Sequence, residues 1–151
     1  MPKRLKHWDY AQSAAYFVTT CTFARRPLFG VVADNVVHHT PLGRLAIEQL
    51  LRTFAALESF EPSYVVMPDH VHLLVRVDHR SNAAATDRLV QRFKARVTHH
   101  GRERALIACS MVVWQRGFFD RIVRTDDEYA ALQQYIETNP LRWTLSRPGK
   151  D

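Results

Sequence analysis

The sequence predicts an α+β fold in which short strands alternate with amphipathic helices. Residues 16–23 and 64–77 are rich in β-branched and aromatic side chains, which are typical of strands. Between and after them lie segments whose apolar residues recur every three to four positions, which is the helical period. A chain of 151 residues with 46% hydrophobic residues can bury a true core, so we expect residues 1–151 to form a single domain.

The N-terminal part of the chain predicts one strand followed by one helix. The strand at residues 16–23 ends before Pro27, and residues 28–39 are compatible with either a short strand or a turn. Thr40 and Pro41 form a typical helix start, with threonine as the cap and proline in the first turn. The apolar face of this helix comprises Ile47, Leu50, Leu51, Phe54 and Leu57.

Residues 64–77 predict a β-hairpin, because a proline-containing turn at residues 67–69 divides two apolar runs. Side chains alternate between the two faces of a strand, so His70 and His72 share one face. Their Cα atoms are roughly 6–7 Å apart, which lets both rings reach one metal ion. Most such histidine pairs are only solvated or hydrogen-bonded, so the spacing alone leaves both interpretations open.

The second half of the chain predicts a helix, a loop and further strands. The helix begins at Ser81 or Asn82, either of which can cap it. Its buried stripe comprises Leu89, Phe93 and Val97. Residues 99–110 contain a glycine and several charges and predict a loop, and residues 111–114 and 118–123 predict strand segments.

The last helix has the clearest start and stop signals. Residues 125–128, TDDE, match a capping box, and Pro140 stops the helix. The predicted element order is therefore β-α-β-β-α-β-α. Without its last helix, this is the split β-α-β pattern of a ferredoxin-like antiparallel sheet with its helices on one face.

The charge pattern suits a polyanionic partner. Twenty-one basic against fifteen acidic residues leave a formal charge of +6, which is compatible with nucleic acid binding or simply with solubility. Arg88, Arg92 and Arg96 recur at every fourth position of the second helix. Such a row is usually a solvated helix face, and phosphate contact is the alternative.

Both ends of the chain are polar and basic. Residues 1–13, which include Lys3 and Arg4, are expected to form an arm, and residues 144–151 a tail. No apolar run approaches the roughly 20 residues that span a bilayer, and the arm lacks the apolar stretch of a signal peptide. We therefore expect a cytoplasmic protein without a membrane partner. The two cysteines are far apart in the sequence, which predicts neither a disulfide nor a cysteine-based zinc site.

Tyr135 lies on the border of the buried stripe of the last helix, and Asn139 follows it by about one turn on the same side. A tyrosine in such a position is most often a packing residue whose hydroxyl contacts water. Next to two histidines it becomes a possible nucleophile, because a tyrosine hydroxyl that attacks a phosphodiester forms a covalent phosphotyrosine. A metal ion on the histidines would polarise the phosphate, and Asn139 can supply a third ligand.

Four blocks of sequence carry a resemblance to a known family. They are YFVTTCTFARRPLF at 16–29, VVMPDHVHLLV at 65–75, WQRGFFDRIVR at 114–124 and YIETNPLRW at 135–143. With these blocks the sequence resembles the single-tyrosine HUH transposases and, within them, the REP-associated tyrosine transposases of bacteria. His70 and His72 stand at the histidines of the HUH motif, in which U is an apolar residue. Tyr135 stands at the nucleophile and Asn139 at the polar position one turn later, and the resemblance spans residues 14–143.

The resemblance implies an RRM-like form of the ferredoxin-like sheet, with an added C-terminal helix that carries Tyr135 beside the histidines. It implies cleavage and transfer of single-stranded DNA at hairpins of repeated extragenic elements, with a 5′-phosphotyrosine, a free 3′-hydroxyl and no ATP. The implied cofactor is Mg²⁺ or Mn²⁺, bound by His70, His72 and Asn139, although two imidazoles by themselves suggest a transition metal such as Zn²⁺. A monomer or a homodimer is compatible with the resemblance.

The sequence departs from the family pattern at two positions. Asp120-Arg121 stands where the family leads us to expect Asp-His, so a role for that histidine is absent or replaced. Asn139 directly precedes Pro140, which biases it away from helical geometry. The helical spacing from Tyr135 therefore does not by itself fix the direction of the Asn139 side chain.

The residues expected to contact DNA are basic or aromatic. They are Lys3, Arg4, Arg88, Arg92, Arg96, Trp114, Arg116 and Arg142. Trp114, Phe118 and Phe119 offer base-stacking surfaces, or else form the aromatic core of an edge strand. Three other functions remain compatible with the sequence: a hairpin-binding protein without catalysis, an RRM-like RNA-binding module, and a rolling-circle replication initiator that shares the HUH motif.

Overall fold

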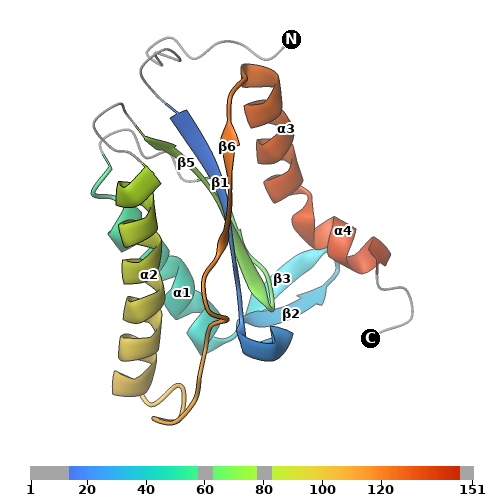
Figure 1. The fold of residues 1–151 in the computed structure, drawn as a ribbon. Coiled ribbons are helices and arrows are strands. Elements are labelled where there is room, and N and C mark those ends of the chain that lie inside the picture. Colours follow the sequence, from blue (N-terminus) through green and yellow to red (C-terminus); the bar gives the residue numbers. More distant parts are fainter. Residues whose placement is uncertain (1–13, 58–62, 78–82, 147–151) are drawn as a thin grey trace.

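The computed structural model describes residues 14–57, 63–77 and 83–146, which form an α+β structure around one antiparallel sheet (Figure 1). In chain order the elements are β1 (Ala14–Cys21), the 3₁₀ turn η1 (Phe23–Arg25), β2 (Gly30–Ala33), β3 (Val36–His39), α1 (Pro41–Phe54), β4 (Tyr64–Val66), β5 (His70–Val77), α2 (Ala83–Glu103), β6 (Phe119–Val123), α3 (Asp126–Glu137) and α4 (Asn139–Ser146). The four-stranded sheet has the order β4-β5-β1-β6, and all its neighbours are antiparallel. This is the strand order of a ferredoxin-like fold, so the predicted fold class is confirmed.

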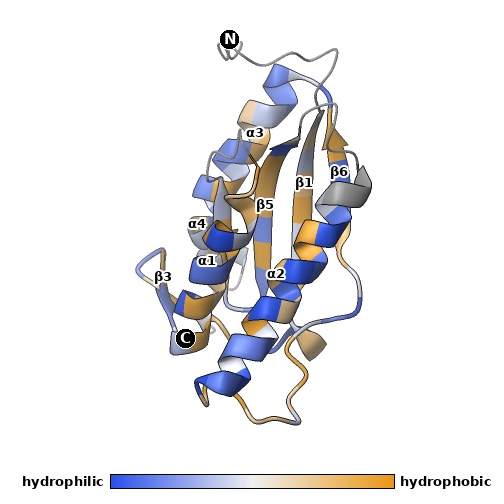
Figure 2. Cartoon of the chain, turned by 90° about the vertical axis from the view of Figure 1, so that its left-hand side faces the viewer, coloured by the Kyte–Doolittle hydropathy of each residue, from blue (hydrophilic) through white to orange (hydrophobic). Residues whose placement is uncertain are grey.

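Helices α1 and α2 cover one face of the sheet (Figure 1). Figure 2 shows apolar residues along β1 and β5 beneath α2, whose outer side is hydrophilic. The main core lies between these layers and includes Val18, Leu45, Leu50, Phe54, Val71, Leu73, Val75, Phe93 and Val97. The predicted cap of α1 is confirmed, because the Thr40 hydroxyl accepts a hydrogen bond of 3.0 Å from the Gly43 amide. Among the described residues, no helix is both long and apolar enough to cross a membrane.

Helices α3 and α4 lie on the opposite face of the sheet (Figure 1). A second, smaller core joins α3 to this face and consists of Ala15, Leu74, Val123, Tyr129, Leu132 and Ile136. The capping signal of α3 is confirmed, because the Thr125 hydroxyl accepts a hydrogen bond of 3.1 Å from the Glu128 amide. This side of the sheet also carries the histidines of β5, so α3 and α4 are the helices that position the site.

The last helix ends as predicted but is followed by another. Helix α3 stops at Glu137, and Thr138 leaves the helical conformation with φ −94° and ψ 4°. Pro140 cannot continue α3, but it fits the first turn of α4, where its missing amide donor costs nothing. Residues 144–146, which were predicted to belong to the basic tail, are therefore helical. The rest of that tail, like the arm at residues 1–13, lies outside the described residues.

Residues 28–39, which the sequence left open, contain the two-stranded hairpin β2-β3. Asp34 and Asn35 form its turn with positive φ angles of 54° and 60°. A two-residue hairpin turn favours that conformation, and aspartate and asparagine tolerate it better than most residues. The hairpin packs against both α1 and α4.

The prediction of a loop at residues 99–110 is wrong for its first part, because α2 continues to Glu103. Gly101 suggested a helix end but is buried inside the last turn, where a Cβ would lie 3.2 Å from a methyl group of Leu42 and 3.3 Å from one of Ile107. The glycine therefore allows close packing here, and a larger residue would push the side chains of Leu42 and Ile107 outward by a few tenths of an ångström. The helix ends one turn later, at Ala105 with φ 56°.

The predicted strand at residues 111–114 is reduced to a single bridge between Thr22 and Trp114. Trp114 is only 8% exposed, its indole nitrogen donates a hydrogen bond of 3.1 Å to the Lys94 carbonyl, and its ring lies 5.2 Å from that of Phe29. The expectation that Trp114 stacks on DNA bases is therefore wrong, because its ring belongs to the core. Phe119, the first residue of β6, is in contrast 70% exposed.

Candidate active site

One open cleft on the α3–α4 side of the sheet gathers the predicted catalytic residues. Its volume is about 370 Å³, and its lining comprises Thr19, Arg25, His70, His72, Tyr135, Asn139, Arg142, Trp143 and Ser146. The strand β5 contributes the two histidines, and α3 and α4 contribute the residues from 135 onward. The structure thus brings together four residues that the sequence analysis took from separate segments: His70, His72, Tyr135 and Asn139.

The two histidines of β5 are held in fixed orientations. Their ring centroids are 4.6 Å apart, and both side chains are buried. His70 donates from Nδ1 to the Asp69 carboxylate over 2.7 Å, and Nδ1 of His72 forms a hydrogen bond of 2.8 Å with the Thr19 hydroxyl. Because both Nδ1 atoms have partners, Nε2 is the nitrogen that each ring keeps for a ligand.

Asp69 and Thr19 hold the two histidines by hydrogen bonds, and neither was singled out in the sequence analysis. Asp69 is itself buried and also forms an ion pair of 3.3 Å with Arg25, which lines the cleft. Its place directly before His70 was a usable signal, because a carboxylate next to a ligating histidine commonly orients the ring. Thr19 gave no such signal, since only the pairing of β1 with β5 places it opposite His72.

Tyr135 lies on α3 with its ring packed against the sheet. The ring meets those of His72 and Phe17 edge-on, at centroid distances of 5.3 and 6.1 Å. The guanidinium of Arg142 lies 5.4 Å from the centre of the Tyr135 ring and comes from the following helix. The tyrosine is half-buried and lines the cleft together with the histidines.

Asn139 is buried at the start of α4, and it lines the cleft despite the proline that follows it. Its amide nitrogen donates a hydrogen bond of 3.4 Å to the carbonyl of Tyr135, one turn earlier. The side-chain oxygen of Asn139 is thus the atom left for a ligand. Because the bond reaches across the break between α3 and α4, this asparagine also ties the two helices together at the site.

The donor set of the cleft fits a divalent metal ion. It consists of two imidazole nitrogens and one amide oxygen, which are ligands that Mn²⁺ and other first-row ions accept. Burial, with smaller contributions from the nearby His70 and Arg25, lowers the pKa of His72 to about 3. His72 is therefore neutral at physiological pH, and the neutral form is the one that binds metal.

The same pKa shift predicts that metal-free protein loses stability as the pH falls. Below a pH of about 6.5 the unfolded chain protonates His72, whereas the folded chain does not until about pH 3. Between about pH 7 and pH 5 the free energy of unfolding should fall by up to about 2 kcal/mol from this residue alone. Urea unfolding in EDTA at the two pH values measures the loss. The variant His72→Gln should show a smaller loss, and an equal loss would contradict the assignment.

The predicted DNA contacts are distributed over both sides of the sheet. Arg142 lies at the cleft, as does Trp143, whose ring stacks 6.2 Å from that of His70. Arg116 is exposed on the segment before β6. Arg88, Arg92 and Arg96 belong to α2, on the face opposite the cleft, and remain predicted contacts of that other surface. Lys3 and Arg4 lie outside the described residues.

Arg121 occupies the position where the family pattern led us to expect a histidine. Arg121 of β6 forms hydrogen bonds of 2.6 and 3.0 Å to the carboxylate of Glu128, in the first turn of α3. These bonds and a third from the Arg124 amide lower the pKa of Glu128. Arg121 thus fastens the start of α3 to the sheet edge and is not among the residues that line the cleft.

The comparisons with known proteins agree with this arrangement. Residues 43–139 match the model of the family described as "Transposase IS200 like", and this range includes both histidines, Tyr135 and Asn139. The chain belongs to the IS200-like transposase family. This IS200-like transposase is 26% identical over 162 residues to an uncharacterized protein of Haemophilus influenzae, with 93% of this chain and 87% of the relative covered.

Two solved structures share the fold of this IS200-like transposase. One is a REP-associated tyrosine transposase bound to a REP hairpin, with a TM-score of 0.63 and 18% identity, covering 95% of this chain and 75% of the other. The other is a putative transposase from Deinococcus radiodurans, with a TM-score of 0.52 and 20% identity, covering 89% and 95%. At these identities the two matches establish the fold, and the roles of individual residues rest on the geometry of the cleft.

Proposed function

We propose that this IS200-like transposase cleaves and rejoins single-stranded DNA at hairpins of repeated extragenic elements, with Tyr135 as the nucleophile. The observation that carries the proposal is the convergence of Tyr135, His70, His72 and Asn139 on one open cleft. The family assignment supports DNA transposition as the reaction. The solved relative bound to a REP hairpin supports the choice of DNA.

In the proposed reaction the hydroxyl oxygen of Tyr135 attacks a backbone phosphorus. A bond forms between this oxygen and phosphorus, and the bond from phosphorus to the 3′ oxygen breaks. The tyrosine proton passes to solvent, and the leaving 3′ oxygen takes up a proton to become a free hydroxyl. The 5′ phosphate stays on Tyr135, so a later 3′-hydroxyl can reverse the step and join a new strand without ATP.

His70, His72 and Asn139 would hold the divalent ion, Mg²⁺ or Mn²⁺. When bound, such an ion polarises the phosphate oxygens and neutralises charge that develops on them. The protein's own contribution is to fix the ligands: Asp69 and Thr19 hold the imidazole rings, and burial keeps His72 neutral.

The orienting role of Asp69 leads to a testable expectation. The variant Asp69→Asn removes the negative charge and leaves only a neutral amide oxygen to accept the hydrogen bond from His70, so Mn²⁺ affinity should fall by about 10–100-fold. Isothermal titration with Mn²⁺ measures the change, and Asp87→Asn, an exposed carboxylate of α2, is the matched control. Unchanged Mn²⁺ affinity in Asp69→Asn would remove Asp69 from the site.

The side chains around the nucleophile suit a single strand of DNA. Arg142 and Arg25 place positive charge at the cleft, where a phosphate would enter. Trp143 offers an aromatic ring beside His70, on which a base next to the scissile phosphate can stack. Basic and aromatic residues in one groove are what proteins use to bind unpaired nucleotides.

The experiment that tests the function compares substrates. The purified protein is incubated with Mn²⁺ and labelled DNA hairpins with single-stranded flanks, the same sequence as a duplex, and the same sequence as RNA. We expect a covalent adduct on a denaturing gel with the DNA hairpin, and no adduct with the duplex or the RNA. Tight hairpin binding without an adduct would support a binding protein that has lost catalysis, and preferential binding of the RNA would support an RNA-binding module.

A further inference from the structure

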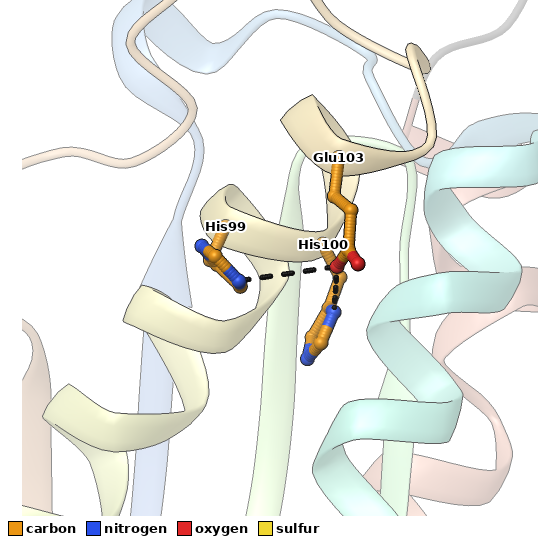
Figure 3. Close-up of side chains that lie close together, drawn as sticks. All are labelled: His99, His100 and Glu103. Carbon is orange, nitrogen blue, oxygen red and sulfur yellow. Dashed lines mark hydrogen bonds and ion pairs between the residues drawn. The ribbon is translucent and has the colours of Figure 1, made fainter.

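A second group of side chains that are able to bind a metal ion lies on the other side of the molecule, at the C-terminal end of α2. His99, His100 and Glu103 project from the last turns of this helix, and their ligand atoms all lie within 4.8 Å of one another (Figure 3). Helix α2 covers the face of the sheet opposite the candidate active site (Figure 1). None of the three residues lines the cleft of Tyr135.

The spacing of the three residues along the helix explains why they converge. At about 100° per residue, Glu103 projects about 40° from His99 and about 60° from His100, on the arc between them. Its carboxylate therefore reaches both rings. Oε2 of Glu103 lies 2.8 Å from Nδ1 of His100 and 3.8 Å from Nε2 of His99.

These distances fit the coordination sphere of a first-row transition metal ion. With bonds of about 2.0–2.2 Å, two ligands at octahedral or tetrahedral angles lie roughly 2.8–3.6 Å apart. The separation of 2.8 Å lies at the lower end of that range and the separation of 3.8 Å just above it, so a small rotation of the exposed His99 side chain closes the site. Two imidazoles and a carboxylate suit Zn²⁺, Co²⁺ or Ni²⁺ better than Mg²⁺, which prefers oxygen ligands.

The helix end itself favours a cation at this place. Helix α2 ends with the two hydrogen bonds of a Schellman motif, from the Leu106 amide to the Gly101 carbonyl over 2.8 Å and from the Ala105 amide to the Arg102 carbonyl over 3.1 Å. Glu103 is thus the last residue inside the helix, where the negative end of the helix dipole opposes a carboxylate. A bound cation removes this conflict.

In the described part of the chain, neither arginine of the same turn is hydrogen-bonded to Glu103, and Arg104 makes only a minor contribution to lowering the pKa of Glu103. The Arg104 guanidinium pairs with Glu48 over 3.1 Å, and Arg102 donates a hydrogen bond of 3.3 Å to the Met111 carbonyl. Both guanidinium groups are thus engaged by groups outside the cluster. The carboxylate of Glu103 interacts with the two histidines, and its pKa is lowered chiefly by the hydrogen bond from His100.

We propose that His99, His100 and Glu103 form a second metal site that binds a transition metal ion such as Zn²⁺, independently of the candidate active site. The ion joins the last two turns of α2 just before the segment that leads to Trp114 and β6. The total metal content of the protein and its response to chelators then reflect two sites. Only the site with His70 and His72 acts on DNA.

The test is a Zn²⁺ titration of metal-free full-length protein in the double variant His70→Ala/His72→Ala. We expect one equivalent of Zn²⁺ to bind. In this background His99→Ala or Glu103→Gln should lower the Zn²⁺ affinity by at least about tenfold, because even the loss of a residue that only orients a ligand costs about that much. Co²⁺ titrated in the same way should give visible absorption bands that His99→Ala removes. Because His99 and Glu103 are exposed, these substitutions should leave the fold intact.

The wild-type background gives an independent version of the test. There, His99→Ala should remove one of two bound equivalents of Zn²⁺, whereas His38→Ala, an exposed histidine of β3, should remove none. The proposal would be overturned if the His70→Ala/His72→Ala variant binds no Zn²⁺ and the wild type binds only one equivalent of Zn²⁺. Binding that neither His99→Ala nor Glu103→Gln weakens would overturn it as well.

Discussion

The variant Tyr135→Phe should form no covalent adduct with hairpin DNA, and its rate of strand cleavage should fall by at least about 10³-fold. The substitution removes only the hydroxyl oxygen that would bond to phosphorus. The ring contacts with Phe17, His72 and Arg142 do not need that oxygen, so the fold and the cleft should persist. Denaturing gels of end-labelled hairpin measure adduct and cleavage together, and circular dichroism checks the fold.

Tyr64→Phe is the matched control for this experiment. Tyr64 is a half-buried tyrosine of β4, paired with Leu73, whose side chain faces the core on the α1–α2 side. It lines no part of the cleft, so Tyr64→Phe should cleave as the wild type does. An adduct that persists in Tyr135→Phe would mean that another residue is the nucleophile. Retained hairpin binding in Tyr135→Phe would show that DNA binding does not depend on the hydroxyl group that cleavage requires.

The second large effect is expected from the histidine pair. The variants His70→Ala and His72→Ala each remove one of three proposed metal ligands, so Mn²⁺-dependent cleavage should fall by at least about 10²-fold. Hairpin binding should change much less, because positive charge at the cleft comes from Arg25 and Arg142. Cleavage rates as a function of Mn²⁺ concentration separate a loss of metal affinity from a loss of turnover.

His38→Ala and His99→Ala are the controls for the histidine variants. His38 is exposed on β3, and His99 belongs to the second cluster on α2, so neither should alter cleavage. Cleavage that survives in both His70→Ala and His72→Ala would contradict the proposed ligand set. Cleavage that is lost in His99→Ala would mean that the cluster on α2 supports the reaction.

Much of the site could be predicted because it depends on local periodicity. Alternation along β5 places His70 and His72 on one face, and helical spacing relates Tyr135 to Asn139. Pro140, which follows Asn139, does not undo this relation, because the helix breaks at Thr138 and restarts at once. The strand order of the sheet followed from the alternation of strands and helices.

The parts that sequence did not predict depend on contacts between distant segments. Thr19 meets His72 only through strand pairing, and the ring of Trp114 is buried because Phe29 and Phe93 surround it. Gly101 suggested a helix end in the sequence, but it lies inside α2, where Leu42 and Ile107 leave little space for a side chain. The position of the arginine row on the opposite face from the cleft likewise needed the arrangement of the layers.

The most direct test of the account is to locate the covalent bond. Trypsin should release residues 125–142 of the adduct as one peptide, which contains both Tyr129 and Tyr135. Fragment mass spectrometry then assigns the nucleotide to one tyrosine. The expected result is a 5′-phosphate on Tyr135. A nucleotide on Tyr129, which is buried against Arg76, or on any residue outside this peptide would contradict it.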